Sequence, residues 1–499
     1  MLKTMARGKP ATPIGLRWRS STVFICITVG VGAFTDMFLY GLIVPVLPFM
    51  LQDRVHTPTS DIQSTISNLL AIYAAASCLA SPIAGVLADR LSSSRQFPFL
   101  LGLILLLLST ILLAVGNSIP VLAVARFLQG ASGGTVWTIG LALLIETVGQ
   151  ENLGKTIGTI FSFCSVAGLF APVIGGLLYE KTGYTGVFGL GIALIAIDFL
   201  LRLFMIEKKV AAKYTTSPPA TPEANPPATE NSANESTPLI QRSPEELDPY
   251  RLPTPKTRLT RALPILLTLR DPGLLTAFFI GFIQAFLLGA FDATVPLVAS
   301  TRYDFNSLQA GLLFFPLGVT DFLFGPIFGW CVDRWGTKPI SVIGFTYLVP
   351  ALALLRLPAE PSVSDKLNLD LPHQIALYAS LLALNGIGLA IINSSSVVES
   401  GNVLEKYWKA NEGLFEGRAP YAQLYGINSM IWSAGLTVGP LVSGVLRVRV
   451  GYGNMNAVLA GICGGTAVLA AVFVGGKRRL SGMGKGKGKR NSGGVEGLE

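Results

Sequence analysis

The sequence predicts an all-α membrane protein with twelve transmembrane helices in two pseudo-symmetric six-helix bundles. Three observations predict this class. Of the 499 residues, 51% are hydrophobic and only 13% are charged, whereas a soluble globular protein carries about 25% charged residues. Twelve apolar runs are long enough to cross a bilayer, and a long polar segment divides them six and six. The two sets of six also share a sequence repeat.

The apolar runs fit the length of about 20 residues that a helix needs to cross about 30 Å of hydrocarbon. Most of the 38 Lys and Arg residues fall in alternate connecting segments, on the side of the N-terminus. The positive-inside rule therefore places both termini in the cytoplasm. The net charge of +9 then reflects topology and does not indicate nucleic-acid binding. The runs lie near 22–49, 64–88, 98–116, 119–145, 155–179, 184–206, 272–299, 307–331, 339–357, 372–398, 421–446 and 452–476.

The polar segment 207–270 is rich in Pro, Thr, Ser, Asn and Glu and has almost nothing to bury. This composition predicts a disordered cytoplasmic linker. The chain then divides into a cytoplasmic tail (1–21), a six-span bundle (22–206), the linker, a second six-span bundle (271–476) and a basic cytoplasmic tail (477–499).

Two short sequence repeats relate the halves. The segments "SPIAGVLADR" (Ser81–Arg90) and "GPIFGWCVDR" (Gly325–Arg334) share Pro, Ile, Gly, Asp and Arg at equivalent places. Each lies at the cytoplasmic end of the second span of its half. A second sequence similarity relates "APVIGG" (Ala171–Gly176) in span 5 to "GPLVSG" (Gly439–Gly444) in span 11. Two parallel six-span repeats indicate a transporter built around a central cavity.

The first repeat resembles the loop signature of the major facilitator superfamily, and the likeness covers nearly all of the chain outside the termini and the linker. The resemblance implies the twelve-helix fold of that superfamily and transport by alternating access. In such a loop the Asp can cap a neighbouring helix while the Arg pairs with an acid across the bundle, which would gate the cytoplasmic side. The alternative is that these are ordinary charged turn residues. The candidate gating residues are Gly85, Asp89, Arg90 and Arg95 in the first copy, and Gly329, Asp333, Arg334 and Lys338 in the second.

Spans 5 and 11 resemble the glycine-proline pattern of proton-coupled antiporters. Small residues let helix backbones approach closely, and a proline bends the helix at a hinge. Ordinary tight packing remains the alternative. The residues concerned are Gly158, Pro172, Gly175 and Gly176 in span 5, and Gly435, Gly439 and Pro440 in span 11.

Ionisable residues inside the apolar runs are the candidate coupling site. Asp36 lies near the middle of span 1, where a carboxylate costs at least about 2.5–3.5 kcal/mol, so we expect it to face a cavity or a partner. Burial favours the protonated form of a carboxyl group, as a proton-coupled carrier requires. Arg126 and Asp292 each lie about 9 Å from the outer ends of their spans and could pair across the halves. Asp198 and Asp321 are further candidates, with a structural hydrogen-bonding role as the alternative.

Several spans resemble those of vesicular amine transporters and related twelve-span drug:proton antiporters, in particular "DMFLYGLIVPVLP" and "LNGIGLAIINSSS". The resemblance implies charged functional residues at Asp36, Arg126 and Asp292. The chain departs from those transporters where they have acids in spans 10 and 11 and a lysine in span 2. These departures favour a neutral or weakly acidic substrate over an amine cation. At these positions this chain has Asn393 in span 10, Asn428 in span 11 and Tyr73 in span 2.

The linker contains "ESTPLI", in which Glu235, Leu239 and Ile240 fit an acidic dileucine sorting signal. Such a signal would direct the protein to a vacuolar or vesicular membrane. The plasma membrane is the main expectation, because a pattern this short also arises by chance.

No phosphate-binding loop, ATPase module or Cys/His metal spacing is found in the sequence. We therefore expect no enzyme activity, cofactor or metal, and a monomer whose partners are a small-molecule substrate, protons and the lipid bilayer. The principal hypothesis is a proton-coupled efflux antiporter of drugs, toxins or secondary metabolites. A proton symporter or facilitator of a nutrient or organic acid, and a transporter-like membrane sensor, remain as alternatives.

Overall fold

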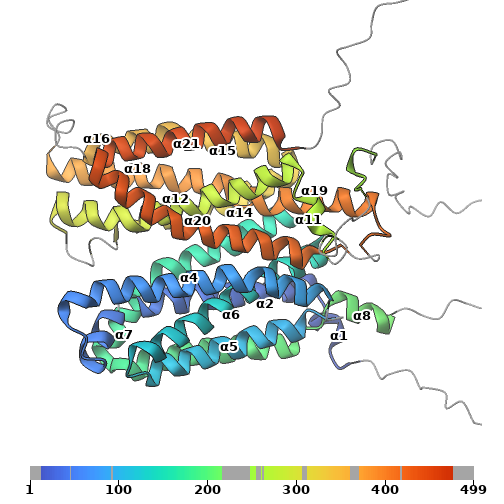
Figure 1. The fold of residues 1–499 in the computed structure, drawn as a ribbon, viewed down its shortest axis with the longest axis horizontal. Helices are drawn as coiled ribbons and strands as arrows, with labels where there is room; N and C mark the ends of the chain where they lie inside the picture. The colour runs from blue at the N-terminus through green and yellow to red at the C-terminus, as the bar shows by residue number, and fades with distance from the viewer. Residues whose placement is uncertain are drawn as a thin grey trace, which may run out of the picture.

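The computed structural model describes residues 13–44, 46–90, 94–215, 248–253, 260, 263–305, 309, 312–359, 370–415 and 419–475. In these parts of the chain the spans are helical, and the two sequence halves form two layers of helices (Figure 1). The N-terminal half contains α2 (Thr22–Ile43), α4 (Thr59–Arg90), α5 (Gln96–Val115), α6 (Ile119–Val148) and α7 (Leu153–Phe204). The C-terminal half contains α12 (Pro272–Tyr303), α14 (Phe314–Trp335), α15 (Thr337–Leu354), α18 (Leu371–Ile392), α19 (Ser395–Ala410), α20 (Tyr421–Val450) and α21 (Tyr452–Phe473).

Helix α7 contains two membrane crossings. Its 52 residues would extend about 78 Å as one straight helix, more than twice the hydrocarbon thickness. Gly183 interrupts the helix with φ 65° and ψ −154°, a conformation that only glycine adopts without strain. With this break the N-terminal half has six spans. The part of the chain that the structure describes has eleven helices long and apolar enough to cross a membrane, and because α7 crosses twice they account for the twelve spans predicted.

Some predicted boundaries are wrong. The first span ends at Ile43 rather than 49, and the chain continues through α3 (Leu47–Phe49) and the π-helical turn η1 (Met50–Arg54). The tenth span breaks after α18, and α19 extends it to Ala410. The two ends of the predicted linker carry short helices, α8 (Lys208–Thr215) and α11 (Ile265–Thr268). Residues 216–247 lie outside the described part of the chain.

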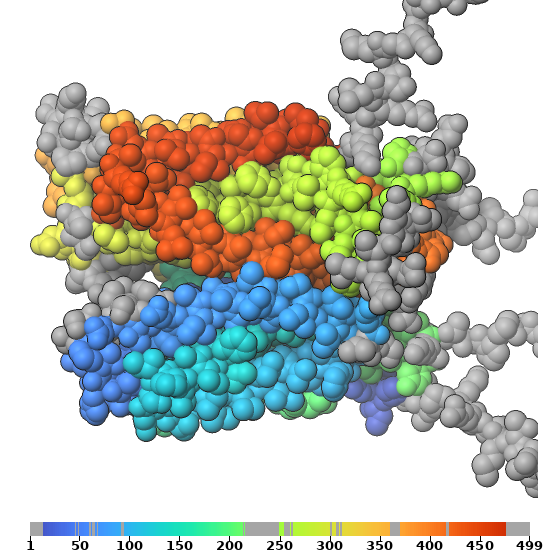
Figure 2. All heavy atoms as spheres, in the orientation of Figure 1, coloured from blue at the N-terminus to red at the C-terminus, as the bar shows by residue number. Residues whose placement is uncertain are grey.

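The two halves meet most closely at the end where α1 (Leu16–Arg19), α8 and α11 lie (Figure 1). We call this the motif end, because Asp89 and Asp333 lie there. Helix α20 lies beside α4 at the motif end and diverges from it toward the opposite end (Figure 1). In the space-filling view the halves touch beside the motif end and are less closely joined away from it (Figure 2).

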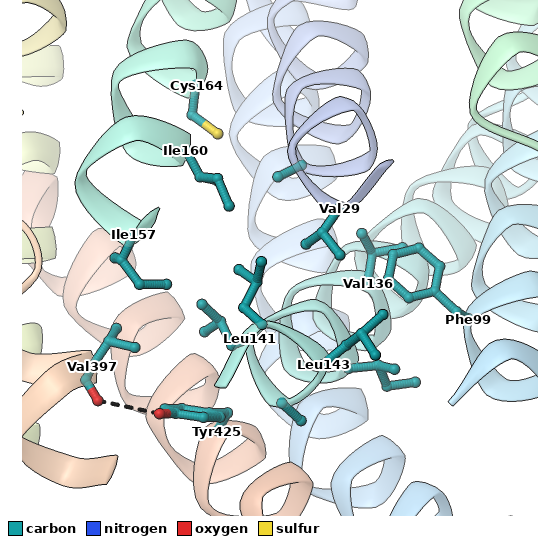
Figure 3. Packing of buried hydrophobic residues seen from close by; sticks show 14 of the residues in the cluster. Val29, Phe99, Val136, Leu141, Leu143, Ile157, Ile160, Cys164, Val397 and Tyr425 are labelled. Carbon is teal, nitrogen blue, oxygen red and sulfur yellow. Dashed lines mark hydrogen bonds between the residues drawn. The ribbon is translucent and has the colours of Figure 1, made fainter. Parts of the chain in front are cut away.

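One apolar cluster spans both halves at the motif end, and a second lies within the C-terminal half. Figure 3 shows the first cluster, in which Leu141 and Ile157 of the N-terminal half lie near Val397 and Tyr425 of the C-terminal half. The Tyr425 hydroxyl donates a hydrogen bond to the Val397 carbonyl at 3.3 Å. Apolar burial therefore holds the halves together at this end.

Candidate functional site

Asp36 lies on α2 at the centre of a polar cluster in the N-terminal half. Its side chain is buried, and Trp137 of α6 donates a hydrogen bond from Nε1 to Asp36 Oδ2 at 3.2 Å. The Tyr73 hydroxyl of α4 lies beside the carboxylate. A Cβ atom added at Gly133 would meet this hydroxyl and both Asp36 oxygens at 3.0–3.1 Å. In the described chain no Lys or Arg forms an ion pair with Asp36. The buried acid is therefore held by neutral donors.

Arg126 of α6 belongs to the same cluster but does not pair with an acid among the described residues. It is fully buried, and its Nη1 donates to Gln129 Oε1 at 2.8 Å. Its guanidinium group lies 5.8 Å from the centre of the Tyr40 ring, and Tyr40 packs on Tyr73 with ring centres 4.8 Å apart. Arg126 Nε and Nη2 have no hydrogen-bond partner. This leaves buried N–H donors that could bind a polar group.

Asp292 of α12 faces the N-terminal half from across the interface. Leu275, Phe279 and Leu297 mark the outer apolar side of α12. Asp292 is turned about 100° or more away from that side, and its side chain is exposed. Tyr40 lies close enough to Arg126 and Asp292 for both charges to act on it. The ion pair between Arg126 and Asp292 that the sequence allows is not found among the described residues.

A second polar cluster lies in the C-terminal half. Gln284 of α12 donates from Nε2 to Asn393 Oδ1 at 2.7 Å, and Asn393 donates from Nδ2 to Asp321 Oδ1 of α14 at 3.3 Å. Asp321 Oδ2 accepts a hydrogen bond from the Ser165 hydroxyl of α7. Asp321 thus joins the two halves through Ser165.

Asn428, another position predicted from the resemblance, lies next to this cluster on α20. Its Oδ1 accepts a hydrogen bond from Ser396 at 3.1 Å. The aromatic rings of Trp137, Phe161 and Trp432 form a row across the interface, with neighbouring ring centres 5.6 Å apart. The row connects the N-terminal polar cluster with α20, so both clusters border one interface.

The repeated Asp residues cap helices of the opposite half, as the sequence predicts for capping. Asp89 of α4 accepts a hydrogen bond from the backbone N–H of Gln423, in the first turn of α20, at 2.9 Å. Asp333 of α14 accepts from the backbone N–H groups of Gly154 and Lys155, in the first turn of α7, at 2.7 and 2.8 Å. A carboxylate stabilises a helix N-terminus by satisfying free N–H groups and by its charge. The two contacts are related by the internal repeat.

The Arg residues of the motif make no ion pair between the two halves in the described part of the chain. Arg95 pairs with Asp89 and with Glu146 of α6, each at 2.7 Å, and all three residues belong to the N-terminal half. Arg90 and Arg334 are exposed and make no ion pair among the described residues. Among the charged side chains of the motif, the two Asp caps are therefore the ones whose described contacts link the halves.

Glycines of the motif allow the helix backbones to touch. A Cβ atom at Gly85 would collide with the Ala422 carbonyl, and one at Gly329 would collide with the Gly154 carbonyl. The predicted hinge positions Gly158, Gly175, Gly435 and Gly439 also face backbone carbonyls of neighbouring helices, whereas Gly176 faces open space. Pro172 and Pro440 lie inside α7 and α20, and Lys338 lies beside Gly475.

Sequence reasoning missed one buried cation, Arg202. It pairs with Asp198 at 3.3 Å, one helical turn away on α7, and both side chains are 0% exposed. Arg202 also donates to the Thr28 carbonyl at 3.2 Å and stacks over the Phe99 ring. All these partners lie within the N-terminal half. Asp198 is therefore part of a structural pair inside the bundle, away from the interface.

Glu235, Leu239 and Ile240 of the sorting pattern lie outside the described residues. No group of three or more His, Cys, Asp or Glu side chains in the described part of the chain could hold a metal ion. The polar clusters at the interface are thus the candidate site, and they can bind a polar solute and protons.

We expect that removing either cap will weaken closure at the motif end. A hydrogen bond to a charged group contributes about 1.5–3 kcal/mol, and Asp333→Ala removes two of them. The exposed residues Glu151 and Glu412 would be replaced with spin-labelled cysteines in a cysteine-free background. Double electron–electron resonance spectroscopy would then measure the distance between the halves. Asp89→Ala and Asp333→Ala should move the distance distribution to longer values. Asp370→Ala, which removes an exposed acid at the opposite end, should not, and equal shifts in all three variants would contradict the capping role.

The fold and site define a membrane transporter with two repeated halves. A family model described as Major Facilitator Superfamily matches residues 29–403. The chain belongs to this superfamily, whose members are transporters and not enzymes. Its described helices agree with the twelve-span fold of two six-helix bundles.

The relatives support the same class. The MFS-type transporter ppzB of Metarhizium rileyi is 42% identical over 484 residues, which cover 93% of this chain and 98% of the relative. The uncharacterized MFS-type transporter C18.02 of Schizosaccharomyces pombe is 37% identical, with 91% and 96% covered. A probable vesicular acetylcholine transporter-B of Danio rerio is 31% identical over 163 residues, which cover 32% of this chain and 33% of that protein.

A solved structure shows the same fold. The human organic anion transporter MFSD10 superposes with a TM-score of 0.58 and 16% identity, covering 90% of this chain and 99% of that chain. At this identity the likeness concerns the fold alone.

Proposed function

We propose that this protein is a proton-coupled antiporter that exports small organic molecules by alternating access. The observation that carries the proposal is Asp36, a buried acid with no ion-pair partner in the described chain. A buried charge without a partner costs far more than a neutral group, so uptake of a proton relieves the cost. An acid that must gain and lose a proton as access changes is suited to coupling proton movement to transport.

Asp292 and Arg126 would bind the substrate. Asp292 is exposed and faces the N-terminal half, and Arg126 has two buried N–H groups without a partner. An arginine does not release its proton at physiological pH, so its role is to position a carboxylate or another acceptor group. Asp36 and Asp292 are the two candidates for proton uptake.

The substrate we propose is neutral or weakly acidic. Tyr73, Asn393 and Asn428 occupy positions at which the vesicular amine transporters carry a lysine and two acids, according to the resemblance. In the structure these three side chains lie in the polar clusters at the interface. Because this chain has asparagines in place of those two acids, its site offers fewer negative charges to bind an amine cation. Drugs, toxins and secondary metabolites without a permanent positive charge are therefore the cargo class.

Gating would occur at the motif end, where Asp89 and Asp333 cap helices of the opposite half. These contacts must break when the halves separate there, and the glycine-proline segments of α7 and α20 would bend. We place the protein in the plasma membrane with both termini in the cytoplasm, acting as a monomer. The vacuolar or vesicular membrane is the alternative that a working sorting signal would produce.

Small-molecule profiling of cells and medium tests this function. Three strains are compared, one expressing the intact protein, one expressing Asp292→Asn and one lacking the protein. A compound that enters the medium only with the intact protein would establish efflux and identify the cargo. A compound that accumulates inside instead would establish import or vacuolar storage and overturn the export direction. Identical profiles in all three strains would contradict transport and favour a membrane sensor.

A further inference from the structure

The amides of Gln284 and Asn393 form a hydrogen-bond chain with a definite direction. Gln284 Nε2 donates to Asn393 Oδ1 at 2.7 Å, and Asn393 Nδ2 donates to Asp321 Oδ1 at 3.3 Å. Gln284 and Asn393 are only 3% and 4% exposed. At the far end of this hydrogen-bond chain, Gln284 Oε1 is buried and has no hydrogen-bond partner among the described residues. Both amides thus point their N–H groups toward Asp321.

The charge of Asp321 explains this direction. An ionised carboxylate can only accept hydrogen bonds, whereas an amide has an acceptor end and a donor end. Asn393 must therefore turn its N–H group to Asp321, which leaves its oxygen to accept from Gln284. Gln284 must in turn leave its own oxygen without a partner. An unpaired buried oxygen costs about 1–3 kcal/mol, so a donor group of a ligand would be favoured there.

Protonation of Asp321 allows the opposite direction. With a proton from water on Oδ1, Asp321 becomes a donor to Asn393 Oδ1 once the amides of Asn393 and Gln284 both turn over. Asn393 Nδ2 then donates to Gln284 Oε1, and the Gln284 N–H groups become the free end. Both arrangements contain two hydrogen bonds, so reversal loses none. What changes is the group at the free end, an acceptor when Asp321 is charged and a donor when it is protonated.

The geometry points to a proton-controlled polarity switch, in which Asp321 sets through Asn393 whether Gln284 offers the substrate an oxygen or an N–H group. This inference rests on the proposed function and deepens it. The substrate that binds when Asp321 is charged carries an N–H or O–H donor, as in an amide or an alcohol. When Asp321 is protonated, the Gln284 oxygen turns away and can no longer accept a hydrogen bond from the substrate. Proton and substrate then compete for one site, which is the requirement for antiport.

The position of Gln284 agrees with this role. It precedes the exposed Asp292 by two turns on α12, about 12 Å along the helix, and therefore lies deeper on the same helix. Asp321 itself bridges the halves, because it accepts a hydrogen bond from Ser165 of α7. The switch thus lies at the interface whose opening and closing moves the substrate.

The charged and titratable neighbours of Asp321 are few. From α7, Cys164 lies close enough for the charges of both Asp321 and Asp36 to act on it, and Ser165 donates a hydrogen bond. The hydrogen bonds that reach Asp321 from the direction of α18 and α12 come from the neutral amides of Asn393 and Gln284. Among the described residues no Lys or Arg forms an ion pair with Asp321. Asp321 is thus the titratable group in direct contact with the amides.

Infrared difference spectroscopy of the purified full-length protein in liposomes tests the switch without any cargo, using the proton as the probe. Acidifying the wild-type protein should produce a carboxylic acid C=O band together with a shift of side-chain amide C=O bands. Asp321→Asn should lose the amide shift together with the part of the acid band that belongs to Asp321, and Asp321→Glu should restore both. Gln284→Met should keep the acid band and lose part of the amide shift. Because no transport is measured, failure of the export proposal would leave this result unchanged.

Asn385→Leu is the matched control. Asn385 is a buried asparagine two turns earlier on α18, and it donates only to backbone carbonyls, of Ala351 and Leu381. Its replacement should preserve the acid band and the amide shift. An amide shift that persists in Asp321→Asn would overturn the inference. So would a wild-type acid band that is lost in Asp321→Asn but titrates without any amide shift.

Discussion

Replacing Asp36 with asparagine is expected to reduce proton-driven transport to the level of liposomes without protein. The substitution removes the carboxylate of the N-terminal cluster but keeps its shape, because an asparagine Oδ1 can accept the hydrogen bond from Trp137. Folding should be preserved, since Asp36 has no ion-pair partner in the described chain that would be left unpaired. The measurement is uptake into proteoliposomes, driven by an imposed pH gradient, of the compound identified by profiling.

Two comparisons make the Asp36 result specific. Exchange of labelled for unlabelled substrate without a gradient should persist in Asp36→Asn, because exchange does not need net proton movement. Asp370→Asn makes the same chemical change at an exposed position and should transport normally. Full gradient-driven transport by Asp36→Asn would remove Asp36 from the coupling mechanism.

Replacing Arg202 with methionine is expected to cause the largest loss of stability. Asp198 and Arg202 are both 0% exposed, and removing one member of a buried ion pair costs about 3–5 kcal/mol because the other charge stays buried without its partner. The melting temperature of the purified protein in detergent should fall sharply. Loss of the contacts to the Thr28 carbonyl and the Phe99 ring adds to the effect.

The double variant Asp198→Leu/Arg202→Met provides the control for the buried pair. Replacing both charges with apolar residues of similar size is often neutral or stabilising, so the double variant should melt well above Arg202→Met. If both variants melt equally low, packing at Arg202 rather than the ion pair would determine stability. That result would contradict the account of the pair.

The number and order of the spans could be predicted from the sequence, because each span must satisfy its backbone hydrogen bonds within an apolar helix. The break at Gly183 and the break between α18 and α19 could not be placed from hydropathy, since the apolar runs continue past them. The helix caps by Asp89 and Asp333 could be predicted from the repeat, because each copy places an acid in the last turn of a span, just before a short loop.

The side-chain partners inside the membrane were harder to predict. Arg126 and Asp292 lie at similar depths in the sequence prediction, but depth does not give the rotation of each helix, which decides whether two side chains can meet. Arg202 was overlooked because it lies near the end of an apolar run, where a basic residue normally faces the cytoplasm. Its spacing of four residues from Asp198 was the signal that would have found the pair. The chain from Gln284 to Asp321 joins three helices and has no local sequence signature.

The direction of proton movement during transport tests the central claim most directly. Proteoliposomes containing the intact protein and an internal pH-sensitive dye would be exposed to an inward gradient of the compound found by profiling, with the membrane potential clamped. The account predicts that substrate entry makes the interior more alkaline, because protons leave as the substrate enters, and that Asp36→Asn abolishes the signal. Acidification of the interior would identify a symporter, and substrate entry with no pH change would identify an uncoupled facilitator. Either result would contradict proton antiport.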